Sequence, residues 1–354
     1  MTPFKMQSDD ILNEVKEFNE KLAEGMVNLM NIGEVPAGVT PHRVVYTEDK
    51  VKLLHYISDK LVVNKVPVLI VYALVNRPYI TDLQENRSTV QGLLDAGQDV
   101  YLVDWGYPDA ADRYLMFEDY LHGYLENCVD YICDQHGIDQ LNMLGICQGG
   151  VLSLCYSSMY PERVKNLITM VTPVDFKTHD NTLSHWAQNI DVDQLVDTLG
   201  NIPGEMLNWT FLNLKPYMLM GQKYVGMVDM MSKPDVLKSF MRMEKWIFDS
   251  PDQAGETFRQ FIKDFFQENK LMKAGVEIGD QTVDLKNITM PVLNVYAEQD
   301  HIVPPSASKA LKKKVSTKDY SELSFAGGHI GIYVSSKAQQ TIPPEIGKWL
   351  NNRQ

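Results

Sequence analysis

Apolar residues in this chain form short continuous runs, rich in valine, isoleucine and leucine, that alternate with stretches of mixed polarity. Such runs are typical of strands that are buried on both faces of a parallel sheet. Two partly polar runs at residues 42–46 and 51–56 precede them and predict a pair of outer strands. The continuous runs lie at residues 66–73, 99–103, 164–171, 290–297 and 320–325, with one more directly before residue 145.

The stretches between these runs predict helices. Residues 89–96 and about 117–135 have helical periodicity, and Gly97 follows the first of them as a stop signal. A final helix is expected at about residues 344–351. Strands that alternate with helices along the chain indicate a mostly parallel, doubly wound α/β sheet.

The alternation fails between residues 175 and 286, where no convincing strand is found. This stretch is rich in methionine and tryptophan, whose side chains pack adaptably and suit a lid or an acyl-binding tunnel as well as an ordinary helical core. We therefore expect a core made of residues 42–174 and 287–354, with residues 175–286 inserted as a large helical cap.

Residues 1–41 are predicted to form an amphipathic helix followed by a linker. Ser8 can cap this helix, and apolar residues recur at helical spacing as far as Leu29. A helix of this kind either packs on the body of the protein or docks onto a partner subunit.

Length and charge limit the classes of function. The 354 residues exceed the usual size of a single core, so one large domain with an insertion, or two domains, is expected. The net charge of −13 argues against a nucleic-acid partner, because phosphate binding requires a basic face. No run approaches the roughly 18 apolar residues of a membrane span, and no apolar signal core begins the chain. The protein is expected to be cytoplasmic.

One cysteine lies in a pattern that predicts chemistry. Cys147 has Gly145 two residues before it and Gly149 two residues after it, directly behind an apolar run. This is the G-x-S-x-G nucleophile elbow with sulfur in place of oxygen, a turn so tight that glycines are needed on both sides. The remaining cysteines fit no zinc pattern, so no metal site is expected, and core packing is preferred for Cys128, Cys133 and Cys155.

Two further residues complete a catalytic triad in the chain order of the α/β-hydrolase fold. Asp300 follows the strand after the insertion, and His329 follows the last strand. Because parallel strands end at one edge of a sheet, we expect Cys147, Asp300 and His329 to converge there. His301, beside Asp300, is a weaker rival for the base, because it directly follows the acid in the chain.

The residue types predict their roles. A histidine in contact with the thiol produces the reactive thiolate, and a carboxylate on the other ring nitrogen fixes the tautomer. The backbone N–H groups of Gln148 and of Val75, in the loop after the 66–73 strand, are expected to form the oxyanion hole. A thiolate that attacks a thioester leaves an enzyme thioester that can still acylate an alcohol, so acyl transfer is favoured over hydrolysis.

The sequence resembles the polyhydroxyalkanoate synthases, in particular the catalytic subunit of the two-component (class III) type. The resemblance covers most of the chain, and the short N-terminal region also suits this class. It rests on Gly145-Ile146-Cys147-Gln148-Gly149-Gly150, Tyr72-Ala73-Leu74-Val75-Asn76-Arg77-Pro78-Tyr79, Asp300-His301-Ile302-Val303-Pro304 and Gly327-Gly328-His329.

The resemblance implies polymerisation of (R)-3-hydroxyacyl-CoA, chiefly 3-hydroxybutyryl-CoA, with release of CoA. On this basis His329 activates Cys147, and Asp300 either orients His329 or acts on the 3-hydroxyl group of the substrate. A companion non-catalytic subunit of the PhaE type, a homo-oligomer such as a dimer, and a cytoplasmic polyester granule are implied. No metal or organic cofactor is implied.

Two other functions are compatible with the same residues. The first is a cysteine hydrolase, such as an intracellular polyester depolymerase or a dienelactone-hydrolase-like enzyme. The second is a non-catalytic granule-binding or scaffold protein that has kept a hydrolase fold.

Overall fold

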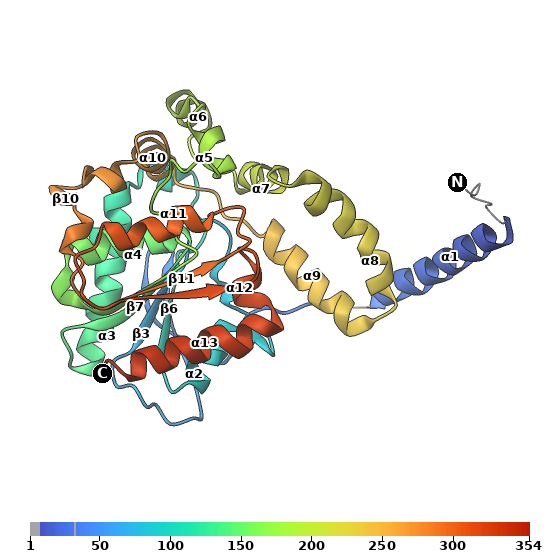
Figure 1. Ribbon diagram of the computed structural model, residues 1–354, viewed down its shortest axis with the longest axis horizontal. Coiled ribbons are helices and arrows are strands. Elements are labelled where there is room, and N and C mark those ends of the chain that lie inside the picture. The colour runs from blue at the N-terminus through green and yellow to red at the C-terminus, as the bar shows by residue number, and fades with distance from the viewer. Residues whose placement is uncertain (1–7, 32) are drawn as a thin grey trace, which may run out of the picture.

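An eight-stranded sheet lies at the centre of the protein in a computed structural model that describes residues 8–31 and 33–354 (Figure 1). Its strands follow the order β1-β2-β6-β3-β7-β8-β11-β12, and each neighbouring pair from β6 to β12 is parallel. β1 and β2 add an antiparallel edge. The expected mostly parallel α/β sheet is confirmed. The strands are β1 (His42–Glu48), β2 (Val51–Tyr56), β3 (Val68–Val71), β6 (Val100–Asp104), β7 (Leu141–Ile146), β8 (Val164–Met170), β11 (Val292–Ala297) and β12 (Tyr320–Phe325).

Helices cover both faces of the sheet, because successive strand residues point to opposite sides. In β3, Leu69 and Val71 pack in the core formed with α3 and α4, whereas Val68 and Ile70 pack in the core formed with α2, α12 and α13. All four side chains are fully buried. The helices are α2 (Thr89–Asp95), α3 (Glu126–His136, preceded by a π-helical turn at Asp119–Leu125), α4 (Gln148–Met159), α11 (Pro305–Lys309), α12 (Gly331–Val334) and α13 (Ser336–Asn351).

Helix α13 starts earlier than the sequence predicts. It begins at Ser336 rather than near residue 344, and the Ser335 side chain caps it by accepting from the Ala338 N–H at 3.1 Å. Pro343 and Pro344 are tolerated inside the helix, although proline normally disrupts a helix interior. Pro343 packs directly on Gly92 of α2, where a Cβ would lie 2.6 Å from the proline ring. Tertiary packing has overridden the local stop signal.

The insertion between β8 and β11 is mainly helical, as expected, but it also contains a short hairpin. The expectation of no strand between residues 175 and 286 is wrong at β9 and β10, which pair antiparallel beside α4. Three residues per strand are too few for a periodic pattern to be recognised. The elements are α5 (Thr182–Ala187), α6 (Val192–Leu199), α7 (Gly204–Asn213), a π-helical turn at Tyr217–Gln222, α8 (Lys223–Met231), α9 (Pro234–Phe248), α10 (Gly255–Gln260), a π-helical turn at Phe261–Gln267, β9 (Val276–Ile278) and β10 (Gln281–Val283).

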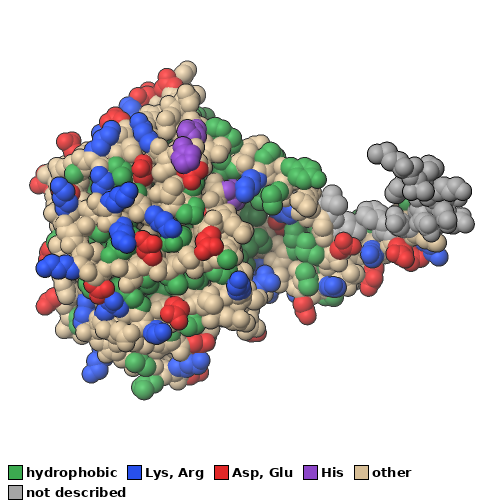
Figure 2. Space-filling view, viewed as in Figure 1, with side chains coloured by type: hydrophobic (Ala, Val, Ile, Leu, Met, Phe, Trp, Pro, Cys, Tyr) green, Lys and Arg blue, Asp and Glu red, His purple; other side chains and the backbone are tan. Residues whose placement is uncertain are grey.

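The last part of the insertion belongs to the main core. Phe261 and Phe265, in the π-helical turn after α10, pack against Phe117 and Phe176 with ring centroids 5.4–6.1 Å apart. These aromatic contacts join residues far apart in the sequence into one apolar cluster beneath the sheet. The segment from α7 to α9 reaches out from the body of the protein towards α1 (Figure 1; the same view is shown in space-filling form in Figure 2).

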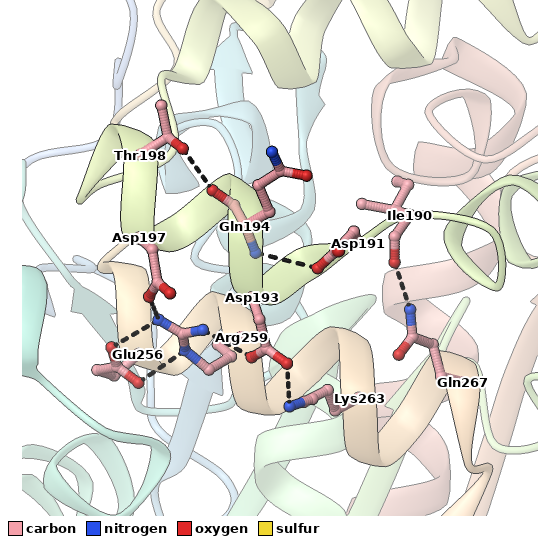
Figure 3. Close-up of polar contacts among 10 residues, drawn as sticks. All are labelled: Ile190, Asp191, Asp193, Gln194, Asp197, Thr198, Glu256, Arg259, Lys263 and Gln267. Atoms are coloured by element: carbon pink, nitrogen blue, oxygen red, sulfur yellow. Dashed lines mark hydrogen bonds and ion pairs between the residues drawn. The ribbon is translucent and has the colours of Figure 1, made fainter.

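A cluster of charges fastens α6 to α10 (Figure 3). Arg259 donates to Asp193 and Asp197 at 2.6 Å and to Glu256 at 3.0 Å. Lys263 binds the other oxygen of Asp193 at 2.6 Å. Hydrogen bonds from the two cations lower the pKa of Asp193. The start of the insertion is thereby tied to the part that packs in the core.

Helix α1 (Ser8–Asn31) contacts the insertion. Gly25 packs on Met231 of α8, and the Asn28 side chain donates to the Met231 carbonyl at 2.9 Å. Figure 1 shows α1 meeting the end of α8 at an angle and pointing away from the body. Met26, Val27 and Met30 are 51%, 57% and 80% exposed. No helix in the described part of the chain is long and apolar enough to cross a membrane.

Candidate active site

The turn between β7 and α4 has the geometry of a strained elbow. Cys147 adopts φ 55° and ψ −121°, in the positive-φ region that side chains rarely occupy. A Cβ at Gly149 would collide with the backbone of Val71 and Tyr72 at the end of β3. A Cβ at Gly145 would meet Gly150, at the start of α4. The two glycines thus allow the helix to start against the sheet, with the Cys147 side chain directly before its N-terminus.

Asp300 and His329 meet at the same edge of the sheet. Asp300 follows β11, His329 follows β12, and Oδ2 of Asp300 lies 2.6 Å from Nδ1 of His329. The other oxygen, Oδ1, accepts from the N–H groups of Ile302 and Val303 at 2.9 and 2.8 Å. Both side chains are buried. Three polar partners, the His329 ring and the N–H groups of Ile302 and Val303, therefore fix the carboxylate in one orientation toward the histidine ring.

The surroundings of His329 favour its charged form. Burial opposes the charge, but Asp300 and the hydrogen-bonded Cys147 side chain outweigh burial and raise the pKa of His329 to about 10. An imidazolium beside the sulfur is the arrangement that stabilises a thiolate. The structure thus brings together the three residues Cys147, Asp300 and His329 that the sequence selects.

His301 lies at the same cavity but has a different environment. It is half-buried, and burial together with the nearby Lys215 lowers the pKa of its ring. Asp300 pairs with His329 and not with His301. The sequence favours His329 over His301 as the base, and the pairing of Asp300 with His329 is consistent with that preference.

Two backbone N–H groups are available beside Cys147. Val75, in the loop after β3, and Gln148, the first residue of α4, line the same cavity as the thiol. Across residues 8–31 and 33–354, neither of these N–H groups donates a hydrogen bond within the protein. Buried N–H groups are normally paired, so a pair left open at a cavity suits an incoming oxygen.

A cavity of about 570 Å³ lies over Cys147 and His329. Its walls come largely from the insertion, which contributes apolar side chains over the elbow. A mostly apolar pocket with a few converging polar groups is the usual form of a small-molecule site. The apolar lining from the insertion includes Phe211, Leu212, Leu219, Met230, Phe240, Met243, Trp246 and Ile247.

Comparison with known proteins gives the family. Residues 5–93 match the family model described as the poly-beta-hydroxybutyrate polymerase (PhaC) N-terminus. The poly(3-hydroxyalkanoate) polymerase subunit PhaC of Allochromatium vinosum is 61% identical over 355 residues, with 100% of both chains covered. The chain belongs to the PhaC family.

Further matches agree with this assignment. The PhaC subunit of a Synechocystis species is 52% identical over 367 residues, covering 100% of this chain and 97% of that protein. PhaC proteins are named poly(3-hydroxyalkanoate) polymerases, which are acyltransferases, so the resemblance inferred from the motifs is confirmed.

The fold is confirmed independently. Residues 66–336 match the α/β-hydrolase fold model. The monoacylglycerol lipase of Paleococcus ferrophilus superposes with a TM-score of 0.54 at 16% identity, covering 82% of this chain and 96% of that one. Similarity at this level establishes a common fold and nothing about the substrate.

Sequence reasoning missed two buried tyrosines of this PhaC chain. Tyr72, directly after β3, and Tyr333, in α12, line the cavity beside Cys147 and hydrogen-bond each other. Burial raises the pKa of both phenols well above the usual value, so both stay neutral. The position of Tyr72 at a strand end is the only local signal that could have pointed to this pair. Its partner, Tyr333, lies far away in the sequence.

Proposed function

We propose that this chain polymerises (R)-3-hydroxyacyl-CoA, chiefly 3-hydroxybutyryl-CoA, into polyhydroxyalkanoate and releases CoA. The observation that carries the proposal is the Cys147 thiol at a strained elbow beside the buried Asp300–His329 pair, on the floor of an apolar cavity. Membership of the PhaC family supports the same substrate class. The reaction needs no metal or organic cofactor.

The first step transfers the acyl group to sulfur. His329 Nε2 takes the proton of Cys147, and the thiolate attacks the thioester carbonyl carbon. The N–H groups of Val75 and Gln148 hold the resulting oxyanion, aided by the N-terminus of α4. When the carbonyl re-forms, the bond to the CoA sulfur breaks and the imidazolium of His329 protonates the leaving thiolate. Cys147 is left as a thioester.

The second step forms the polymer bond. The 3-hydroxyl group of another hydroxyacyl unit attacks the Cys147 thioester, and its proton passes to His329 as the ester forms and the sulfur leaves. Asp300 is buried, and both of its oxygens are already engaged. This supports the role of Asp300 in orienting His329, rather than direct contact with the substrate hydroxyl.

The insertion, residues 175–286, is proposed to act as the cap over this site. Its apolar side chains form much of the cavity wall, and excluding water favours attack by a hydroxyl group over hydrolysis of the thioester. An intracellular depolymerase or a dienelactone-hydrolase-like enzyme would need water at the same place. The non-catalytic scaffold alternative leaves the paired Asp300 and His329 without a purpose.

The product distinguishes synthase from hydrolase. Purified protein supplied with (R)-3-hydroxybutyryl-CoA, with and without its companion subunit, is expected to release CoA and to form an ester-linked polymer. Chromatography and mass spectrometry of the products separate oligomers from the free acid. Free 3-hydroxybutyrate as the sole product, with the companion subunit present, would refute the synthase function and favour the hydrolase.

We also propose that α1 binds the companion subunit of the PhaE type, and that the assembly, with a PhaC dimer, works on cytoplasmic polyester granules. Changing Met26, Val27 and Met30 together to glutamine is expected to weaken the complex at least about tenfold, because an apolar contact surface is lost. Sedimentation with the purified companion subunit measures this loss. The matched control is Leu61→Gln, an exposed apolar residue of the body (83% exposed). If the triple variant and the control bind the companion subunit with equal affinity, this surface of α1 is not part of the interface.

A further inference from the structure

One peptide group in the loop after β3 is held by a side chain from the insertion. Gln253 donates its Nε2 hydrogen to the Leu74 carbonyl oxygen at 2.7 Å. The Leu74 carbonyl and the Val75 N–H belong to the same planar trans peptide, where they point in opposite directions. The bond that fixes the carbonyl therefore also fixes the direction of the Val75 N–H.

The rest of this loop is anchored by other groups. Gln148 accepts from the Leu74 N–H at 3.1 Å. Trp105 donates to the Tyr72 carbonyl at 2.9 Å, and Trp246 donates to the Arg77 carbonyl at 2.8 Å. Each of these bonds holds a neighbouring peptide. In the described part of the chain, Gln253 alone binds the peptide that carries the Val75 N–H.

Gln253 is itself rigidly placed. Its backbone pairs with Ile202 in both directions, with two hydrogen bonds of 2.9 Å, and its side chain is only 4% exposed. Val75 and Gln148 line the cavity, whereas Gln253 is absent from the described cavity wall. Gln253 therefore sits behind the loop and can influence a bound acyl group only through the loop.

We propose that Gln253 is a positioning residue for acyl transfer, which aims the Val75 N–H at the oxygen that becomes negative during attack by Cys147. This inference rests on the proposed function of Cys147 and on the oxyanion role of Val75. An oxyanion donor is effective because it is oriented before the reaction begins. A hydrogen bond on the carbonyl also polarises the N–H of the same peptide, which strengthens it as a donor.

Losing Gln253 has a defined consequence. The buried Leu74 carbonyl would be left without its donor, which is unfavourable. The peptide would then be free to rotate towards another donor, and the same rotation would turn the Val75 N–H away from the cavity. In the described part of the chain no hydrogen bond joins Gln253 to Cys147, Asp300 or His329, so these three residues would keep their geometry.

The experiment uses Gln253→Met, which keeps the length of the side chain and removes the donor. We expect kcat for CoA release from 3-hydroxybutyryl-CoA to fall about 10- to 100-fold, with little change in KM. The rate of Cys147 alkylation by iodoacetamide should stay at the wild-type value. Alkylation needs the thiolate but displaces iodide at a saturated carbon, so no oxyanion forms.

Alkylation reports on Cys147 because the other thiols are protected. Cys128, Cys133 and Cys155 are buried, and burial raises the pKa of all three, to about 12 for Cys128. The matched control is Gln267→Met. Gln267 also donates its side-chain amide to carbonyls of the insertion, to that of Ala187 at 3.1 Å and to that of Ile190 at 2.8 Å (the latter bond is drawn in Figure 3).

The outcomes separate the hypotheses. A fall in kcat with normal alkylation, absent from Gln267→Met, supports the proposal. Unchanged kcat overturns it, and a parallel fall of kcat and alkylation overturns it in favour of a general structural role.

Replacing the Val75 N–H by a backbone ester oxygen is a second test. This change should lower kcat alone, and adding Gln253→Met should cause no further loss. Normal turnover of Cys147→Ala would overturn the proposed function itself, whereas an inactive Cys147→Ala beside a fully active Gln253→Met overturns only the positioning role.

Discussion

Replacing Cys147 by alanine is expected to lower the rate of CoA release from 3-hydroxybutyryl-CoA by roughly 10⁴-fold or more. In the proposed mechanism the thiol forms the covalent intermediate, and loss of a nucleophile leaves only the contribution of binding and of the oxyanion hole. CoA release and mass spectrometry of the acylated protein measure the two halves of the reaction. Turnover should fall far below the wild-type rate, and mass spectrometry should detect no covalent acyl adduct of the variant.

The matched control for this variant is Cys155→Ala. Cys155 lies within α4, the helix that follows Cys147. It is fully buried in the apolar core, and burial raises the pKa of its thiol. Its loss should leave the rate of CoA release within a few-fold of wild type. Turnover by Cys147→Ala comparable to that of Cys155→Ala would show that the elbow is not the reaction centre, as the scaffold hypothesis requires.

Replacing Asp300 by asparagine is expected to lower kcat by about 10⁴-fold with little change in the fold. The Ile302 and Val303 N–H groups hold Oδ1, so the asparagine keeps its oxygen there and turns its NH₂ towards Nδ1 of His329. A donor at Nδ1 forces the ring proton onto Nε2, which then cannot accept the thiol proton. The pKa of His329 should also fall, because burial then acts without the opposing charge.

Two measurements test this prediction. Both CoA release and iodoacetamide alkylation of Cys147 should slow, in contrast to Gln253→Met, because Asp300 acts on the formation of the thiolate. Asp180→Asn serves as the control, since this carboxylate accepts from the hydroxyl group of the exposed Ser306 and is not paired with a histidine of the triad. Alkylation at the wild-type rate in Asp300→Asn would contradict the orienting role.

The three candidate residues could be predicted from the sequence because their positions depend on topology. Continuous apolar runs identify the parallel strands, and parallel strands end at one edge of the sheet. Cys147, Asp300 and His329 each follow such a run, so their meeting requires no knowledge of side-chain packing. The glycines at 145 and 149 add local information, since the close approach of α4 to β3 leaves no space for a Cβ.

Contacts between distant segments could not be predicted. Pro343, inside α13, packs on Gly92 of α2, and Gly25 of α1 packs on Met231 of α8. No local pattern marks Gln253, which binds Leu74 across a separation of 179 residues. A glutamine in a loop is compatible with solvent exposure until the insertion folds back and buries it.

The sequence by itself determined the strands of the parallel sheet, the elbow at Cys147 and the positions of Asp300 and His329, because each is encoded by residues that lie close together in the chain or at strand ends. Only the tertiary structure decided which peptide groups face the thiol and what holds them. Gln253 binds the carbonyl of the Leu74–Val75 peptide, and Gln148 accepts from the N–H of the preceding Ala73–Leu74 peptide. The direction of a backbone N–H depends on its hydrogen-bond partners in the folded protein, and those partners come from elements that only the complete fold brings together.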